Sequence, residues 1–302
     1  MNSPIKAREI PGLFLTAAKG WSSDNVPRLG ASLAYYTLFS IAPVLIIAIA
    51  IAGFVFGADA VRGEIVVQLQ GLMGTEGATV VQDLVENASR PGRGAIALTI
   101  GSITFVLAAT GVFLELQYAL NTIFRVKAKV GGNVSLFLKA RLRSFGLVIS
   151  IGFVLLVSLG ISAVMAATSK WVGDGYVGAS IVWQVLNVGV SFAVISLLFA
   201  VVYRFLPDVK LSWRDVWVGS VMTAILFTTG KQLLGVYLGR SGTTSSYGAA
   251  GSVILILLWV YYSAQIILFG AELTRVFVER VHGPPPTEAF AEPDPAARPS
   301  VA

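Results

Sequence analysis

An apolar stretch near residue 40 carries polar side chains along one helical face. That face consists of Ser32, Tyr36, Ser40 and Pro43. Their spacing of i, i+4, i+8 and i+11 places them on one side of an α-helix. Pro43 has no backbone N–H and leaves the carbonyl of Phe39 without its helical donor, so we expect a kink there. A kinked polar face can line a cavity inside a membrane, but prolines are common in membrane helices, and we favour close packing between helices as the role of this face.

A second polar face lies in an apolar stretch near the C-terminal end. Tyr261, Gln265 and Glu272 are spaced i, i+4 and i+11. Because polar groups cost free energy inside a bilayer, Gln265 needs a hydrogen-bond partner there. For Glu272 we favour pairing with Arg275 or another basic residue of a loop. Glu115 ends another apolar stretch, and we expect it on the same side of the bilayer as Glu272.

Lys231 is the one cation well inside an apolar stretch. It follows Arg214 by seventeen residues, which is about 25 Å along a helix. We favour a lysine that extends to the outer headgroups, and an inward-facing anchor for an anionic headgroup is the alternative. The predicted substrate-pathway residues are Tyr36, Ser40, Pro43, Glu115, Lys231, Tyr261, Gln265 and Glu272.

The residues that most enzymes need are missing from the sequence. The chain has no cysteine and one histidine, His282, so thiolate sites and imidazole-rich metal sites are excluded. It has no Walker motif, no HExxH and no G-x-S-x-G in a usable context. The sequence therefore predicts no catalytic site, no metal site and no cofactor, and a protein that is not an enzyme.

Composition determines the class of elements that carry these residues. The chain of 302 residues is 55% hydrophobic and 13% charged, whereas a soluble domain has about 25% charged residues. We therefore predict an all-α polytopic membrane protein. Six segments have the length of about 20 apolar residues that a membrane span requires. They are Ala31–Gly57, Ala95–Leu114, Phe145–Thr168, Ile181–Tyr203, Val216–Leu238 and Tyr247–Leu273.

The basic residues predict the orientation of these segments. With six spans, 16 of the 22 Lys and Arg residues fall on the side that holds both termini. Since cytoplasmic loops are enriched in Lys and Arg, both termini are expected in the cytoplasm. Membrane insertion also explains the net charge of +6, so we expect no nucleic-acid partner.

Three segments are predicted to lie outside the bundle. Residues 1–30 form a cytoplasmic amphipathic segment and precede a six-helix transmembrane domain of residues 31–282. Within that domain, residues 58–93 form an extracytoplasmic segment, in which we expect two short amphipathic helices broken by Gly71–Gly77. Residues 283–302 hold six of the twelve prolines and are predicted to be a disordered cytoplasmic tail.

Several of these segments together resemble the YihY/BrkB family, also called the ribonuclease BN-like inner-membrane family. The resemblance covers roughly Trp21 to Val281. It rests on Leu33-Ala-Tyr-Tyr-Thr-Leu-Phe-Ser-Ile-Ala-Pro43, on Tyr203-Arg-Phe-Leu-Pro207, on the run from Tyr247 to Tyr261 and on Gly270-Ala-Glu-Leu-Thr274. The resemblance implies a six-span protein of the bacterial inner (plasma) membrane and gives no catalytic residues.

Two functions remain open at this point. The first is a transporter that moves or flips an amphipathic envelope molecule such as an anionic lipid, in keeping with the envelope-lipid roles associated with the family. The second is a membrane scaffold that docks envelope machinery through residues 58–93. The expected partners are membrane lipids, together with a second copy of the chain or an envelope protein. Ribonuclease activity is disfavoured, because no nucleophile–base pair or metal site can be assembled.

Overall fold

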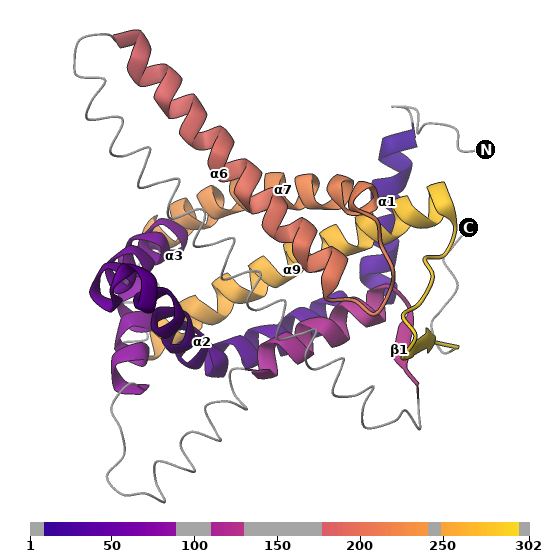
Figure 1. Ribbon diagram of the computed structural model, residues 1–302, viewed down its shortest axis with the longest axis horizontal. Coiled ribbons are helices and arrows are strands. Elements are labelled where there is room, and N and C mark those ends of the chain that lie inside the picture. The colour runs from indigo at the N-terminus through magenta and orange to yellow at the C-terminus, as the bar shows by residue number, and fades with distance from the viewer. Residues whose placement is uncertain (1–8, 89–109, 130–176, 241–248, 296–302) are drawn as a thin grey trace, which may run out of the picture.

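The computed structural model describes residues 9–88, 110–129, 177–240 and 249–295, and these are mainly helical (Figure 1). This result confirms the all-α class. Residues 110–123 are also helical. The other elements are α1 (Ile10–Ser23), α2 (Val26–Phe56), α3 (Ala58–Ala88), β1 (Val126–Ala128), α6 (Val177–Phe205), α7 (Trp213–Arg240), α9 (Ala249–His282) and β2 (Ala291–Pro293).

Within these described ranges, three helices are long and apolar enough to cross a membrane. They are Val26–Ala50, Val188–Phe205 and Val253–His282. The predicted fifth span, Val216–Leu238, is continuously helical within α7 but is not one of the three. The predicted third span, Phe145–Thr168, and most of the second, Ala95–Leu114, lie outside the described residues. A count of six spans therefore stays a prediction.

The longest of these helices, α9, is the axis of the bundle. It packs against α1, α2, α3 and α7, and α6 packs against α7. The ring of Phe227 in α7 meets Phe199 of α6 and Trp259 of α9 edge-on, with centroids 5.7 and 5.8 Å apart. Aromatic pairs in this arrangement contribute about 0.5–1.5 kcal/mol each beyond area burial. The ring of Phe227 therefore joins the three helices through two edge-on contacts.

The helices α7 and α9 cross at two glycines, Gly219 and Gly270. A Cβ at Gly219 would collide with the Thr274 hydroxyl, and a Cβ at Gly270 would collide with the hydroxyls of Thr223 and Tyr203. Tyr203 also donates to the Ile267 carbonyl at 2.7 Å. Glycine thus lets the backbones of α7 and α9 approach closely, and the Tyr203 hydroxyl of α6 bonds to Thr223 of α7 and to the Ile267 carbonyl of α9 beside this crossing.

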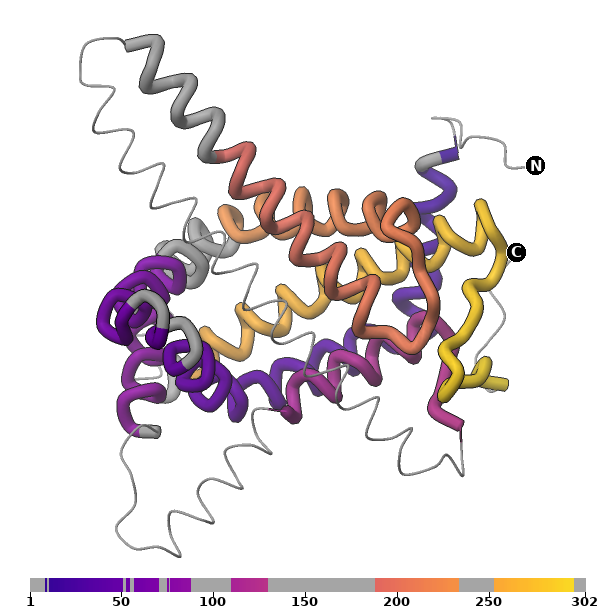
Figure 2. The backbone as a smooth tube through the Cα atoms, viewed as in Figure 1, coloured from indigo at the N-terminus to yellow at the C-terminus, as the bar shows by residue number. Residues whose placement is uncertain are grey.

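Both described ends of the chain lie at one end of the bundle, and α3 lies at the other (Figures 1 and 2). The turn between α6 and α7 is also at the first end. There Asp208 is 5% exposed and accepts hydrogen bonds from Gln117 Nε2 at 3.0 Å and Asn121 Nδ2 at 2.7 Å. Asn121 Oδ1 in turn accepts from the Asp208 N–H at 2.8 Å. This clamp fixes residues 110–123 to the end of α6.

The predicted disorder of residues 283–302 is wrong for residues 283–295. In this segment β2 pairs antiparallel with β1, and Ala291 is 1% exposed. Proline lacks an N–H but its carbonyl still accepts, as the 2.8 Å bond from Lys210 N to Pro286 O illustrates. The proline-rich composition therefore did not prevent docking onto a surface that supplies the donors. Residues 296–302 lie outside the described residues.

The predicted break at Gly71–Gly77 is also wrong as a break in helicity, because α3 runs unbroken from Ala58 to Ala88. The N-terminal half of α3, which contains Ile65, and its C-terminal half, which contains Val85, nevertheless pack in one apolar cluster with Ile49 of α2. Residues twenty apart on a straight helix are about 30 Å apart. The helix must therefore bend strongly between these two residues.

We expect Gly270→Ala to destabilise the bundle by about 1–3 kcal/mol or more, because the new methyl group would overpack the α7–α9 crossing. The thermal unfolding midpoint should fall by about 2–4 °C for each kcal/mol. Gly189→Ala is the matched control, since a Cβ at Gly189 meets nothing within 4 Å. Equal midpoints for the two variants would contradict the close crossing.

We expect Asn121→Ala to cost about 1.5–3 kcal/mol, because it removes a hydrogen bond to a buried carboxylate and leaves Asp208 short of a donor. The free energy of unfolding in detergent measures this loss. The neighbouring Thr122→Ala removes only a local bond to the Tyr118 carbonyl and should change it by much less. A loss for Asn121→Ala no larger than that of the control would refute the clamp.

Candidate functional site

The predicted amphipathic N-terminal segment contains α1, whose apolar face packs against α9. Ala17 is fully buried and forms a cluster with Leu273 and Val276. The rings of Phe14 and Phe269 meet with centroids 6.3 Å apart. The helix is therefore held along the last turns of α9.

This contact places α1 directly over a charged pair of α9. A Cβ at Gly20 would lie 2.6 Å from Glu272 Oε2 and 2.8 Å from Arg275 Nη2, which is closer than a carbon can approach. Glu272 is 0% exposed and Arg275 is 1% exposed. Glycine at position 20 thus lets the α1 backbone cover both side chains.

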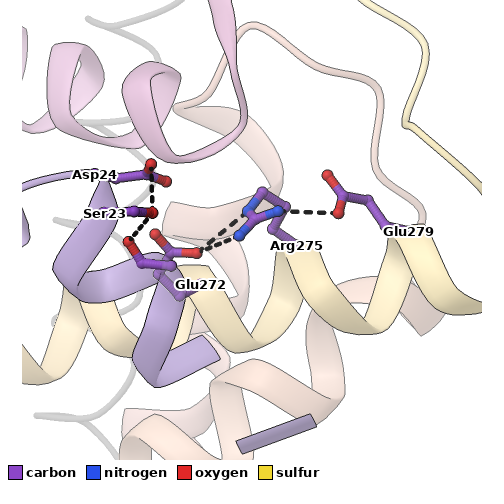
Figure 3. Close-up of polar contacts among 6 residues, drawn as sticks. Ser23, Asp24, Glu272, Arg275 and Glu279 are labelled. Atoms are coloured by element: carbon purple, nitrogen blue, oxygen red, sulfur yellow. Dashed lines mark hydrogen bonds and ion pairs between the residues drawn. The ribbon is translucent and has the colours of Figure 1, made fainter. Parts of the chain in front are cut away.

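Arg275 binds carboxylates on both sides along α9 (Figure 3). Its Nη2 and Nε donate to Glu272 Oε2 at 2.8 and 3.2 Å, and its Nη1 donates to Glu279 Oε2 at 2.9 Å. The predicted pairing of Glu272 with Arg275 is confirmed. The pair is buried rather than interfacial, so its attraction must offset a large desolvation cost.

A third carboxyl group joins the pair from the turn between α1 and α2. Ser23 Oγ donates to Asp24 Oδ1 at 3.2 Å, and the Asp24 carboxyl lies within hydrogen-bonding range of the Glu272 carboxyl. Asn25 follows in the left-handed region at φ 54°, which asparagine tolerates better than most residues. We call Asp24, Glu272, Arg275 and Glu279 the acid–arginine cluster.

Gln265 has a partner that spacing alone did not indicate. Its Oε1 accepts from Trp21 Nε1 at 3.1 Å, and a Cβ at Gly30 would run into its amide nitrogen and lie 3.6 Å from the ring of Tyr261. Gln265 and Tyr261 therefore join α9 to the end of α1 and the start of α2. Trp21 is therefore the hydrogen-bond partner that we expect for Gln265, and it donates to the amide oxygen.

The predicted polar face of α2 contacts a different helix. Ser40 is 2% exposed, and Pro43 is buried inside α2. A Cβ at Gly111 would lie 3.2 Å from the ring of Tyr36 and 3.8 Å from Ser40 Oγ. Tyr36 and Ser40 therefore pack together against residues 110–123.

The structure does not gather the eight predicted pathway residues in one place. Glu115 is half-buried in the helix of residues 110–123, and Lys231 is half-buried in α7. Tyr36 and Ser40 form one contact group and Tyr261 and Gln265 another, while Glu272 lies in the acid–arginine cluster. That these residues line a substrate pathway stays a prediction.

A cavity of about 510 Å³ lies between α2 and the two halves of α3. Sequence reasoning did not predict this cavity. The cavity exists because the bend in α3 brings distant residues together, and no local pattern contains that information. It is lined by Leu45, Ile49, Arg62, Gly63, Ile65, Val66, Leu69, Val81, Gln82, Val85 and Glu86.

The part of the chain that the structure describes contains no candidate metal site. No group of three or more His, Asp or Glu side chains is placed to hold an ion there. His282 contacts Asp215, with Nδ1 and Oδ1 3.2 Å apart. The arrangement therefore offers two kinds of site, a buried charged cluster at one end of the bundle and an amphipathic cavity at the other.

Three relatives are described as UPF0761 membrane proteins. That of Paraburkholderia xenovorans is 28% identical over 84% of this chain and 57% of its own length. That of Alcanivorax borkumensis is 26% identical over 91% and 63%, and that of Neisseria meningitidis serogroup B is 26% identical over 84% and 60%.

This chain thus spans less than two thirds of the length of these relatives. No solved structure matches it significantly. The family model described as Virulence factor BrkB matches residues 17–294, a range that contains α2, α3, α6, α7 and α9 and the second half of α1. By this match over most of its length, the chain belongs to the BrkB family of membrane proteins.

Proposed function

We propose that this membrane protein binds an amphipathic molecule of the bacterial envelope, such as an anionic lipid, in the α2–α3 cavity and transports or flips it. The observation that carries the proposal is the cavity itself. Its volume of about 510 Å³ falls in the range of about 300–1,000 Å³ that is typical of ligand sites.

The walls of this cavity suit a hydrocarbon chain. Aliphatic side chains of α2 and of both halves of α3 form most of the lining, among them Leu45, Ile49, Leu69 and Val81. Burial of each methylene group of a ligand against such walls contributes about 0.8 kcal/mol. An acyl chain is therefore a better match than a polar solute.

Polar groups at the same cavity suit a charged headgroup. Arg62, Gln82 and Glu86 all line it, and Arg62 and Gln82 are exposed to the surroundings. A guanidinium binds phosphate through two parallel hydrogen bonds. The neighbouring amide and carboxylate add partners for hydroxyl or amine groups. This combination favours an anionic phosphate headgroup over a neutral one.

Apolar side chains outside the cavity are consistent with access from the bilayer. Phe54 is 93% exposed at the end of α2, and Val67 and Leu84 of α3 are 59% and 36% exposed. Exposed apolar side chains on the two helices that form the cavity offer a surface that a bilayer can cover. A ligand dissolved in the membrane would meet the cavity through this surface.

Filling the cavity tests the proposal. In Ile65→Trp the indole would occupy space that the ligand needs, so we expect co-purifying lipid and the flip rate of a fluorescent anionic lipid in proteoliposomes to fall about tenfold, or about 1.4 kcal/mol. Thr79→Trp adds the same group at an exposed position of the same helix that does not line the cavity, and it should change neither. Equal flux in the two variants, with a protein partner retained by both, would favour the scaffold function instead.

Headgroup recognition is tested separately with Arg62→Gln. This change removes the positively charged guanidinium and leaves a shorter, neutral polar side chain. We expect the preference for anionic over zwitterionic lipid, measured by native mass spectrometry after gentle extraction, to fall about tenfold, which corresponds to about 1.4 kcal/mol. Arg28→Gln, at an exposed position of α2, is the control. An unchanged preference in Arg62→Gln would remove Arg62 from the site.

A further inference from the structure

The charges of the acid–arginine cluster do not balance if every group is ionised. Three carboxylates would then share one guanidinium, and Glu272, which is 0% exposed, would face a second carboxylate across the α1–α9 contact. Like charges in close contact inside a protein are costly, and such pairs take up a proton instead. The fully ionised cluster would therefore carry two uncompensated negative charges.

The hydrogen bonds of the cluster show which carboxyl oxygen atoms lack a partner. Glu272 Oε2 is occupied by Arg275, whereas neither Glu272 Oε1 nor Asp24 Oδ2 has a donor among the described residues, although both atoms are buried. The two carboxyl groups lie within hydrogen-bonding range of each other. One proton shared between the two carboxyl groups would give both of these oxygen atoms a hydrogen-bond partner.

Among the residues that the structure describes, the charged groups around Glu272 do not supply that donor. Asp24 and Arg275 are the charged groups that act on Glu272, from the α1–α2 turn and from α9 respectively. Glu279 acts on Arg275 from the other side. Ser23 is nearby, but its hydroxyl lies 3.1 Å from the Gly20 carbonyl and 3.2 Å from Asp24 Oδ1.

We propose that Asp24 and Glu272 form a proton-binding site that holds one proton between their carboxyl groups. A proton taken up from solvent converts one carboxylate into a carboxyl group, whose O–H donates to the other. No covalent bond between heavy atoms changes. The proton belongs to the pair rather than to either residue.

This proton removes the charge imbalance from the buried part of the cluster. The Asp24–Glu272 pair then carries a single negative charge, which Arg275 neutralises. The remaining negative charge is on Glu279, whose side chain is 23% exposed and reaches solvent. The site also lies across a helix contact, so the proton joins the α1–α2 turn to α9. The inference does not depend on the lipid function proposed for the α2–α3 cavity.

Infrared spectroscopy of the full chain in lipid nanodiscs at neutral pH tests the site. A protonated carboxyl group has its own carbonyl band, which shifts in deuterated water. We expect Asp24→Asn and Glu272→Gln each to lose the intensity of a single carboxyl group per chain, because an amide donates to the carboxylate that remains. Glu279→Gln is the matched control and should keep the band.

Unchanged intensity in both variants would overturn the proposal. Loss in Glu272→Gln but not in Asp24→Asn would also overturn it, because the proton would then reside on Glu272 alone. Asp24→Asn leaves both hydrogen bonds from Arg275 to Glu272 in place. It therefore gives the decisive result even if Glu272→Gln does not fold.

Discussion

The buried pair of Glu272 and Arg275 constrains how α1 and the start of α2 can pack. An ion pair in a low-dielectric interior is tolerated only where it is covered and hydrogen-bonded. The cover is α1, which approaches closely because residue 20 is glycine. Since α1 leads through a short turn into α2, the position of the pair also determines where α2 begins. The Trp21–Gln265 hydrogen bond and the contact of Gly30 with Gln265 then hold the start of α2 on α9.

The requirement that a buried polar group has a hydrogen-bond partner also explains other close contacts of the bundle. Tyr203 buries its hydroxyl where it can donate to a backbone carbonyl of α9, and Asp208 is buried where Gln117 and Asn121 supply donors. Buried polar groups without partners would cost more than the contacts gain. Polar side chains therefore act as the specific links between helices, whereas apolar packing between them is less selective.

Local spacing predicted those features that depend on nearby residues. Glu272 and Arg275 are one helical turn apart, so their pairing follows from the sequence. The partner of Gln265 is 244 residues away, and Asp24 reaches Glu272 only because α1 folds back onto α9, so neither contact has a local signal. The bend of α3 and the docking of residues 283–295 also depend on distant partners. In both places composition indicated a break or disorder, and tertiary contacts decided otherwise.

The two sites lie at opposite ends of the bundle, and α2 and α9 both run from one end to the other. Cluster residues come from α9 and from the turn before α2, while Leu45 and Ile49 of α2 line the cavity. Rigid helices transmit a displacement along their length but not a local rearrangement. Any coupling between Asp24 and the cavity would therefore require α2 to move as a unit against α9. The contacts at Gly30 oppose such a movement, because there is no space for α2 to approach α9 more closely. Any movement of α2 that links the two sites must then be a slide or rotation along α9.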